Sequence, residues 1–471
     1  MHKEISQQDF FREAQIEYIA LKKKVWTYFH DTFLPTSRID QYENEMLRFL
    51  KKEKNRLLLH SLVGQNPLLE LKHVLQIFYF RERGEKVSLR EMNPYLREYL
   101  NKDNIKIFNK PQFNGKAVLE QLNDLLIHRI KLPKSGPEEV IRSWLPQQFE
   151  KALNNIPKQI LKEEGFGKVI RVMGGVFLFA LSELKNNMSD KEVHDKIEIA
   201  LKGGYYYGMF YPLIDDLLDN SHVFSSRQKI ELMDLLNHWI IGDFSLKNVL
   251  KSNSSMKLLE EIFKEFHKLF PLEDNPQLYK AALMLHFSQL EDANKNFKTQ
   301  YSIQDLFVPI IIKASYTRVV GAAISGTRID NKLHKHMIET GLMYQLSDDF
   351  RDWGNDTKNK LFTPFTYYQY GPSKQPINPV SLFLSIYRVY FLKFESDPLF
   401  VKLMAKKLSV TIQRFNDKNT PKETQADFWK IINKNKEIGK LIAHINKSKY
   451  RILDPDTDFT KPIDEIINRG I

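Results

Sequence analysis

Apolar residues recur at intervals of three and four along most of this chain of 471 residues. Clear examples are DFFREAQIEYIALKKKVWTYFHDTF, which begins at residue 9, and LYKAALMLHFSQLEDANKNF, which begins at residue 278. This period places apolar side chains on one face of an α-helix, whereas the alternating β-branched runs that are typical of strands are scarce. The sequence therefore predicts an all-α fold.

The chain is longer than one compact domain usually is, so we expect two regions. Proline, glycine and asparagine gather where helices should break, at 63–67, 131–139, 270–276 and 370–379. We place the boundary at KLPKSGPEE, residues 131–139. It separates a helical N-terminal region, residues 1–145, whose role the sequence does not define, from a second region, residues 146–471.

Composition excludes several kinds of site. The chain has no cysteine, which excludes disulfides, thiolate metal sites and cysteine nucleophiles, so any metal must bind to oxygen or histidine. The formal charge is +12, but lysine and arginine are spread along the chain without a nucleic-acid-binding signature, which argues against nucleic acid as a partner. No unbroken apolar run approaches the roughly 18 to 20 residues of a membrane span, and the first residues lack an apolar signal core, so we expect a cytoplasmic protein.

Two acidic clusters interrupt apolar helical segments. The first, in YPLIDDLLDN, contains Asp215, Asp216 and Asp219, and the second, in YQLSDDFRDWGND, contains Asp348, Asp349 and Asp352, with Asp356 one turn later if the helix continues through Gly354. Residues three or four apart share a helix face, so the carboxylates of each cluster can converge. Crowded carboxylates repel unless a cation neutralises them, and Mg²⁺ prefers oxygen ligands shared with substrate phosphates. The alternative is that each motif is the polar face of a surface helix, but apolar residues precede both clusters.

The pair of clusters resembles the first and second aspartate-rich motifs of the trans-isoprenyl diphosphate synthases, members of the class I isoprenoid synthase superfamily. YQLSDDFRD matches the family pattern of an aromatic residue, Gln, an aliphatic residue, any residue and DDxxD. Three further segments occur in the family's order: GFGKVIRVMGGVFLFALSE at 165–183, IIIKASYTRVVGAAISG at 310–326 and NDTKNKLFTPFTYY at 355–368. The resemblance covers residues 146–471.

The resemblance implies a helical bundle around a central cavity and Mg²⁺-dependent ionisation of an allylic diphosphate, with prenyl diphosphates and isopentenyl diphosphate as ligands. It makes both aspartate clusters catalytic, with Asp215, Asp216, Asp219, Asp348, Asp352 and Asp356 as metal ligands and Asp349 beside them. It implies that the substrate contacts Lys168, Arg171, Arg227, Lys313, Gln345 and Lys360. By the same resemblance, Tyr207, Phe210 and Tyr211 face the growing chain and favour a short-chain product, unless these aromatic side chains are simply core packing.

Departures from the family pattern keep other functions open. The paired arginines after the first motif are reduced to Arg227 with Lys229 nearby, and Ala314 stands where threonine usually follows Lys313. Asp348, Asp352 and Asp356 also have the spacing of the metal triad of class I terpene synthases, which use one diphosphate substrate. The alternatives to chain elongation are therefore a terpene synthase and a catalytically weak partner subunit that binds prenyl diphosphates.

The N-terminal 145 residues lie outside the resemblance. They contain amphipathic segments with basic edges, such as LLELKHVLQIFYFRERGEK. Such helices usually cover a core, so we expect them to dock on the second region. The sequence leaves open contact with a partner protein, contact with an anionic membrane surface, and a homodimer.

Overall fold

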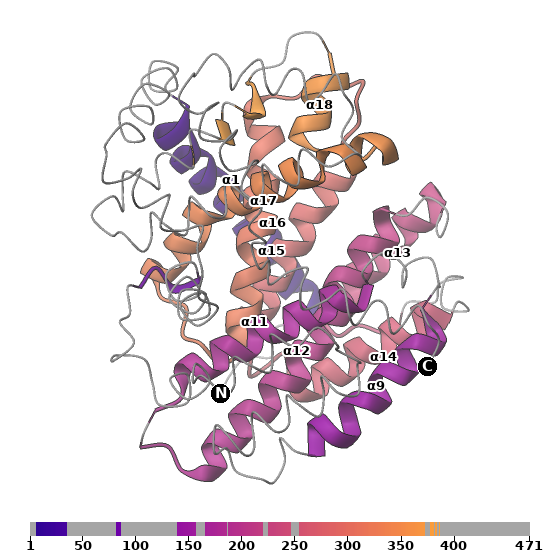
Figure 1. The fold of residues 1–471 in the computed structure, drawn as a ribbon, viewed down its shortest axis with the longest axis vertical. Helices are drawn as coiled ribbons and strands as arrows, with labels where there is room; N and C mark the ends of the chain where they lie inside the picture. Colours follow the sequence, from indigo (N-terminus) through magenta and orange to yellow (C-terminus); the bar gives the residue numbers. More distant parts are fainter. Residues whose placement is uncertain are drawn as a thin grey trace, which may run out of the picture.

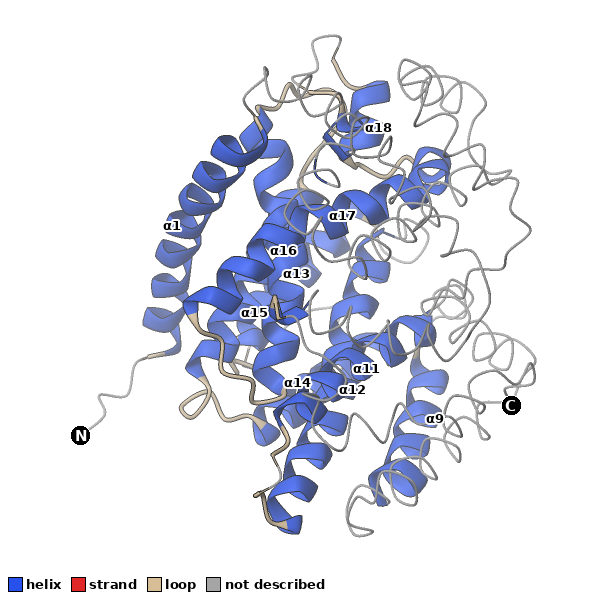
Figure 2. Ribbon diagram, turned by 60° about the vertical axis from the view of Figure 1, so that its left-hand side comes forward, coloured by secondary structure: helices blue, strands red, loops and turns tan. Residues whose placement is uncertain are grey.

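The computed structural model describes residues 6–34, 82–85, 139–156, 165–185, 187–219, 225–245, 254–372, 377–380, 382–383 and 386. Within these residues the protein is all-α, with ten α-helices, a π-helical segment and no strand, which confirms the predicted fold class (Figures 1 and 2). The elements are α1 (Gln7–Phe33), η3 (Val140–Trp144), α9 (Leu145–Asn155), α11 (Gly165–Glu183), α12 (Asp190–Asp219), α13 (Ser226–Ile240), α14 (Ser254–Leu269), α15 (Pro276–Ala293), α16 (Ile303–Ile324), α17 (Asn331–Asn359) and α18 (Pro364–Tyr370).

Side-chain caps define where several helices begin. Ser225 and Ser302 each form a capping box at the start of α13 and α16, and Asp330 accepts a hydrogen bond from the backbone N–H of Leu333 at the start of α17. These caps satisfy N–H groups that have no partner inside the helix. The expected breaks at 270–276 and 370–379 coincide with the start of α15 and the end of α18, whereas 63–67 and 131–138 lie outside the described residues.

Helix α16 is the centre of the bundle. It packs against α1, α11, α12, α15 and α17, and most of its side chains are buried. By length and composition alone α16 could cross a membrane, although the sequence showed no unbroken apolar run of that length. Because 72% of this stretch is buried inside the protein, its apolar character is that of a central core helix.

The N-terminal helix α1 docks on this core, beside α15 and α16. The ring of Phe29 in α1 packs against the ring of Phe307 in α16, with 5.5 Å between the ring centroids. The Lys22 ammonium binds the Glu291 carboxylate of α15 at 2.8 Å. Docking is therefore the observed role of α1, whereas most of the segment LLELKHVLQIFYFRERGEK lies outside the described residues.

Candidate functional site

Helix α12, which carries the first aspartate cluster, runs antiparallel to α16. The Tyr207 hydroxyl donates a hydrogen bond to the backbone carbonyl of Thr317 at 2.8 Å. One turn earlier on α12, Gly203 lies so close to α16 that a Cβ there would be 2.6 Å from Ile324. Residue numbers therefore rise along α12 as they fall along α16, and Asp215 lies beyond Tyr207 toward the N-terminal end of α16.

Helix α17, which carries the second cluster, also runs antiparallel to α16. Arg318 of α16 donates hydrogen bonds to the backbone carbonyl of Met337 and the hydroxyl of Thr340. Further along α17, a Cβ on Gly341 would be 2.2 Å from the hydroxyl oxygen of Ser315, because the two helices approach closely there. Asp349 lies two turns further on, again toward the N-terminal end of α16.

The two clusters therefore lie at the same end of the central helix. Asp215 follows Tyr207 by eight residues, and Asp349 follows Gly341 by eight. At a rise of 1.5 Å per residue, each cluster is about 12 Å beyond a contact with the same turn of α16. Two helices that are distant in sequence both pack against α16 and thus bring their acidic segments to one level of the bundle.

One face of the second cluster is buried. The Asp349 side chain is buried and accepts a hydrogen bond from the Gln345 amide nitrogen at 2.8 Å. Burial raises the pKa of Asp349 to about 8. The hydrogen bond from Gln345 and the charge of Lys313 lower this pKa. The neighbouring carboxylates of Asp348 and Asp292 raise it. Lys313, on α16, is thus a predicted substrate-binding cation whose charge acts on the second cluster.

The other face of the second cluster is open to solvent. The side chains of Asp348 and Asp352 are 55% and 42% exposed, and Arg351 forms ion pairs with both. Its Nη2 atom lies 2.9 Å from Asp352 Oδ2, and its Nε donates to Asp352 Oδ1 at 3.2 Å. Arg351 is absent from the site residues predicted from the sequence, although its position between the two aspartates was a signal for it.

Asp356 lies on the buried side of α17. The helix continues through Gly354 to Asn359, so Asp356 follows Asp352 by one turn of the same helix. The three aspartates at positions i, i+4 and i+8 therefore differ in exposure, since Asp348 and Asp352 face solvent and Asp356 does not. Lys360, the next predicted substrate contact, is exposed and ends the helix in the left-handed conformation, with φ of 55°.

The first cluster is described at the level of its backbone. Helix α12 extends to Asp219 and continues past Pro212, so the three aspartates of this cluster share one helix. The structure describes the backbone but not the side chains of six predicted site residues: Lys168, Arg171, Tyr211, Asp215, Asp216 and Asp219. Their proposed roles stay predictions.

Two cations follow the first cluster, and the structure separates them. Arg227 is 89% exposed and pairs with Glu231 on its own helix at 3.0 Å. The Lys229 ammonium instead donates a hydrogen bond to the backbone carbonyl of Leu218, directly beside Asp219. Lys229 is therefore the cation that the described residues bring to the end of α12, where the resemblance had assigned Arg227.

Two of the three predicted chain-facing aromatic residues, Tyr207 and Phe210, belong to the core. The ring of Phe210 stacks on Phe263 of α14, with 4.8 Å between centroids, and meets Phe266 edge-on at 5.2 Å. Tyr207 is buried and bonded to α16. Core packing, the alternative given above, accounts for both contacts, and a role in product length stays a prediction.

The described carboxylates fit a metal that is shared with a substrate. Among these residues, no group of three or more histidine or acidic side chains could hold a metal by itself. Asp348 and Asp352, one turn apart and accessible, can supply two oxygen ligands. Since Mg²⁺ is commonly held by one or two carboxylates, water and substrate phosphates, this pair suits a magnesium ion that arrives with a diphosphate.

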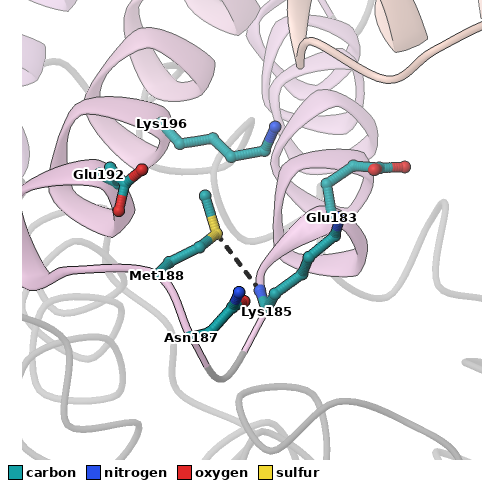
Figure 3. A pocket seen from close by; sticks show the side chains of 6 residues that line it. All are labelled: Glu183, Lys185, Asn187, Met188, Glu192 and Lys196. Atoms are coloured by element: carbon teal, nitrogen blue, oxygen red, sulfur yellow. Dashed lines mark hydrogen bonds between the residues drawn. The ribbon is translucent and has the colours of Figure 1, made fainter.

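A separate cavity of about 340 Å³ lies between the end of α11 and the start of α12 (Figure 3). It is lined by Glu183, Lys185, Asn187, Met188, Glu192 and Lys196. Both of its carboxylates already have partners, since Glu183 pairs with Arg83 and Glu192 caps α12 through Ser189. Lys196 approaches Gly326, at the C-terminal end of α16, so this cavity lies at the opposite end from the aspartates.

Comparisons of the chain with protein-family models, with curated proteins and with solved structures found no match. The resemblance to isoprenoid synthases therefore rests on the motifs quoted above. The geometry adds one independent feature, the common level of the two acidic clusters along α16.

Proposed function

We propose that the protein is a magnesium-dependent isoprenoid synthase that ionises an allylic diphosphate and condenses it with isopentenyl diphosphate to a short-chain prenyl diphosphate. The observation that carries this proposal is the position of the two aspartate clusters toward one end of α16, on two helices that both pack against it. A diphosphate clamped between two carboxylate sets needs this arrangement. A single acidic motif on a surface helix does not need it.

The residues of the chain have separable roles in this proposal. Asp348 and Asp352 would hold magnesium together with the first cluster, and bound magnesium would withdraw charge from the diphosphate as its carbon–oxygen bond breaks. Lys313 lies on the central helix near Asp349, where its ammonium can bind a phosphate oxygen. Gln345 holds Asp349 through its amide nitrogen and so fixes the buried side of the cluster.

A second candidate is a partner subunit that binds prenyl diphosphates without turning them over. The ion pairs of Arg351 favour it, because a guanidinium that neutralises Asp348 and Asp352 opposes metal binding there. A class I terpene synthase is the third candidate, since α17 carries Asp348, Asp352 and Asp356 on one uninterrupted helix. Both alternatives keep the all-α fold and differ in their products.

Product analysis separates the three functions. The full-length protein is incubated with Mg²⁺ and C5, C10, C15 or C20 allylic diphosphates, each with and without isopentenyl diphosphate. We expect products longer by multiples of five carbons, formed only when isopentenyl diphosphate is present. A hydrocarbon or alcohol formed without it would indicate a terpene synthase, and diphosphate binding without any product would indicate the subunit.

Variants then assign the site. The double variant Asp348→Ala/Asp352→Ala should lose turnover by at least about 100-fold, since it removes the charge-stabilising metal ligands. Asp234→Ala, which removes an exposed aspartate of α13, is the matched control and should keep full activity. Equal activity of the double variant and the control would place the chemistry elsewhere.

A further inference from the structure

Three consecutive residues of the N-terminal region each contact a different helix of the bundle. Glu82 accepts a hydrogen bond from Arg318 Nε of α16 at 2.6 Å. Arg83 donates to the Ser182 hydroxyl of α11 at 3.0 Å and pairs with the neighbouring carboxylate of Glu183. Gly84 lies against α17, where a Cβ would be 2.9 Å from the His336 ring. We call residues 82–84 the strap; Figure 1 shows this segment as an isolated purple piece beside the bundle.

Gly84 shows how closely the strap is fitted. Its φ of +67° is in the left-handed region, which glycine adopts without steric cost. A side chain at this position would need both an unfavourable backbone conformation and a displaced His336, whose own side chain is buried. The chain therefore passes α17 with no space for a larger residue.

The ion pair between the strap and α16 is buried. The side chains of Arg318 and Glu82 are only 12% and 5% exposed. Removing one partner of such a pair leaves a charge in a site that water reaches poorly, which costs far more than breaking a surface ion pair. The carboxylate from the N-terminal region is thus part of what allows a guanidinium to lie inside the bundle.

Arg318 also connects α16 to the part of α17 that precedes the second aspartate cluster. Its Nη1 donates to Thr340 Oγ1 at 2.6 Å and to the Met337 carbonyl at 3.3 Å. Its guanidinium lies over the ring of Tyr344, 5.1 Å from the centroid. Tyr344 directly precedes Gln345, whose amide holds Asp349.

We propose that the strap fixes α17 against α16 through the pair of Glu82 and Arg318, while Arg83 ties the strap to α11, so that the N-terminal region holds the second aspartate cluster in place. Arg318 is a positioning residue, because it touches Thr340 and Tyr344 and acts on the cluster through them. The part of this inference that concerns turnover rests on the proposed function. The part that concerns the position of α17 does not.

Hydrogen exchange in the full-length protein tests the position of α17. In Glu82→Gln, which keeps the size of the side chain and removes its charge, exchange within residues 331–359 should quicken at least about tenfold, while α13 and α14 stay as in the wild type. Glu82→Asp, which keeps a carboxylate for Arg318, should retain more of the protection in α17 than Glu82→Gln does. Unchanged exchange in α17, or an equal increase in every helix, would overturn the proposal.

A matched control and a milder variant support this test. Glu17→Gln weakens another tether of the N-terminal region, the ion pair of 2.6 Å between Glu17 and Lys280 of α15, and should leave exchange in α17 unchanged. If Glu82→Gln does not fold, Arg318→Lys keeps a cation for Glu82 but loses the fork that reaches Thr340 and Tyr344. Arg318→Lys should quicken exchange in α17 more than in the other helices. Exchange equal to that of the wild type would overturn the proposal that the strap holds α17.

Turnover gives a separate readout. If the wild type forms prenyl products, Glu82→Gln should lower kcat in parallel with the loss of protection in α17, and Glu82→Asp should retain more of both. Full kcat together with quickened exchange would show that the strap holds α17 without serving the reaction, which overturns its functional part. If the wild type forms no product, the proposed function fails. The exchange result still shows whether the strap holds α17 in position.

Discussion

The two faces of the second aspartate cluster differ although they share one turn of helix. Asp349 is buried, accepts a hydrogen bond from Gln345, and has a pKa raised to about 8 by its burial. Asp348 and Asp352 are half exposed and pair with Arg351. Neighbouring aspartates in one short motif are therefore set for different tasks. Burial favours the neutral form of Asp349, whereas Asp348 and Asp352 are exposed and lie in ion pairs with Arg351.

Asp349 is thus part of the packed bundle, whereas Asp348 and Asp352 are the aspartates that a ligand can reach. A neutral Asp349 can lie in the bundle without a counter-ion because burial disfavours its charged form. The exposed pair carries the negative charge that could attract a metal, and Arg351 balances that charge in the structure. The three predictions below test the contrast, beginning with the largest expected effect.

The buried face should make stability depend on pH. Between the ordinary aspartate pKa of 3.8 and the folded value of about 8, the folded protein holds a proton that the unfolded chain has lost. One such proton lowers the free energy of unfolding by about 1.4 kcal/mol for each pH unit of rise within this window. Asp349→Asn keeps the shape without the titration, so its stability should fall less from pH 5 to pH 8.

Urea unfolding at several pH values, with a chelator present, measures this difference. Asp352→Asn is the control from the exposed face and should keep the pH dependence of the wild type. Parallel curves for the wild type and Asp349→Asn would contradict the buried, protonated state of Asp349.

The hydrogen bond from Gln345 should contribute a smaller amount. Gln345→Leu leaves the buried Asp349 carboxyl without this donor at 2.8 Å, so the free energy of unfolding should fall by about 1 to 2 kcal/mol at pH 6. Since this hydrogen bond favours the charged form, the variant should also raise the pKa of Asp349 further. Unfolding in urea checks the first effect, and the second requires the pH series described above.

The exposed face should show the smallest effect. Exposed ion pairs contribute up to about 1 kcal/mol, so Arg351→Gln should tighten Mn²⁺ binding about twofold to fivefold by removing a competing cation. Electron paramagnetic resonance of free Mn²⁺ measures this binding without any turnover. Arg351→Lys, which keeps the charge, is the control, and weaker binding by the glutamine variant would contradict competition between Arg351 and the metal.

Much of the fold could be predicted from local sequence. The apolar period of α1 and α15, the serine caps of α13 and α16, and the break before Pro276 are all consequences of nearby residues. The continuation of α17 through Gly354 was uncertain from the sequence, since a single glycine weakens a helix without ending it.

For the site, the sequence predicts which residues are candidates and which of them share a helix, but not which of them are buried. The sequence shows that Asp348, Asp349 and Asp352 share a turn, but the buried side of that turn depends on what packs against it. The same limit applies to Phe210, whose apolar ring is equally suited to a cavity wall and to the stack on Phe263 that the structure shows. Lys229 was nearby in sequence, but its contact with α12 depends on the angle at which α13 returns.

The sequence by itself determined that this chain forms helices and that two of them carry aspartate clusters, because helix periodicity, caps and residue spacing act over a few neighbouring residues. The tertiary structure decided that both clusters meet one end of α16, that Asp349 is buried beside its exposed neighbours, and that residues 82–84 contact three helices at once. These features depend on contacts between residues far apart in the chain, and the burial and charge pairing that result exist only once the helices have packed.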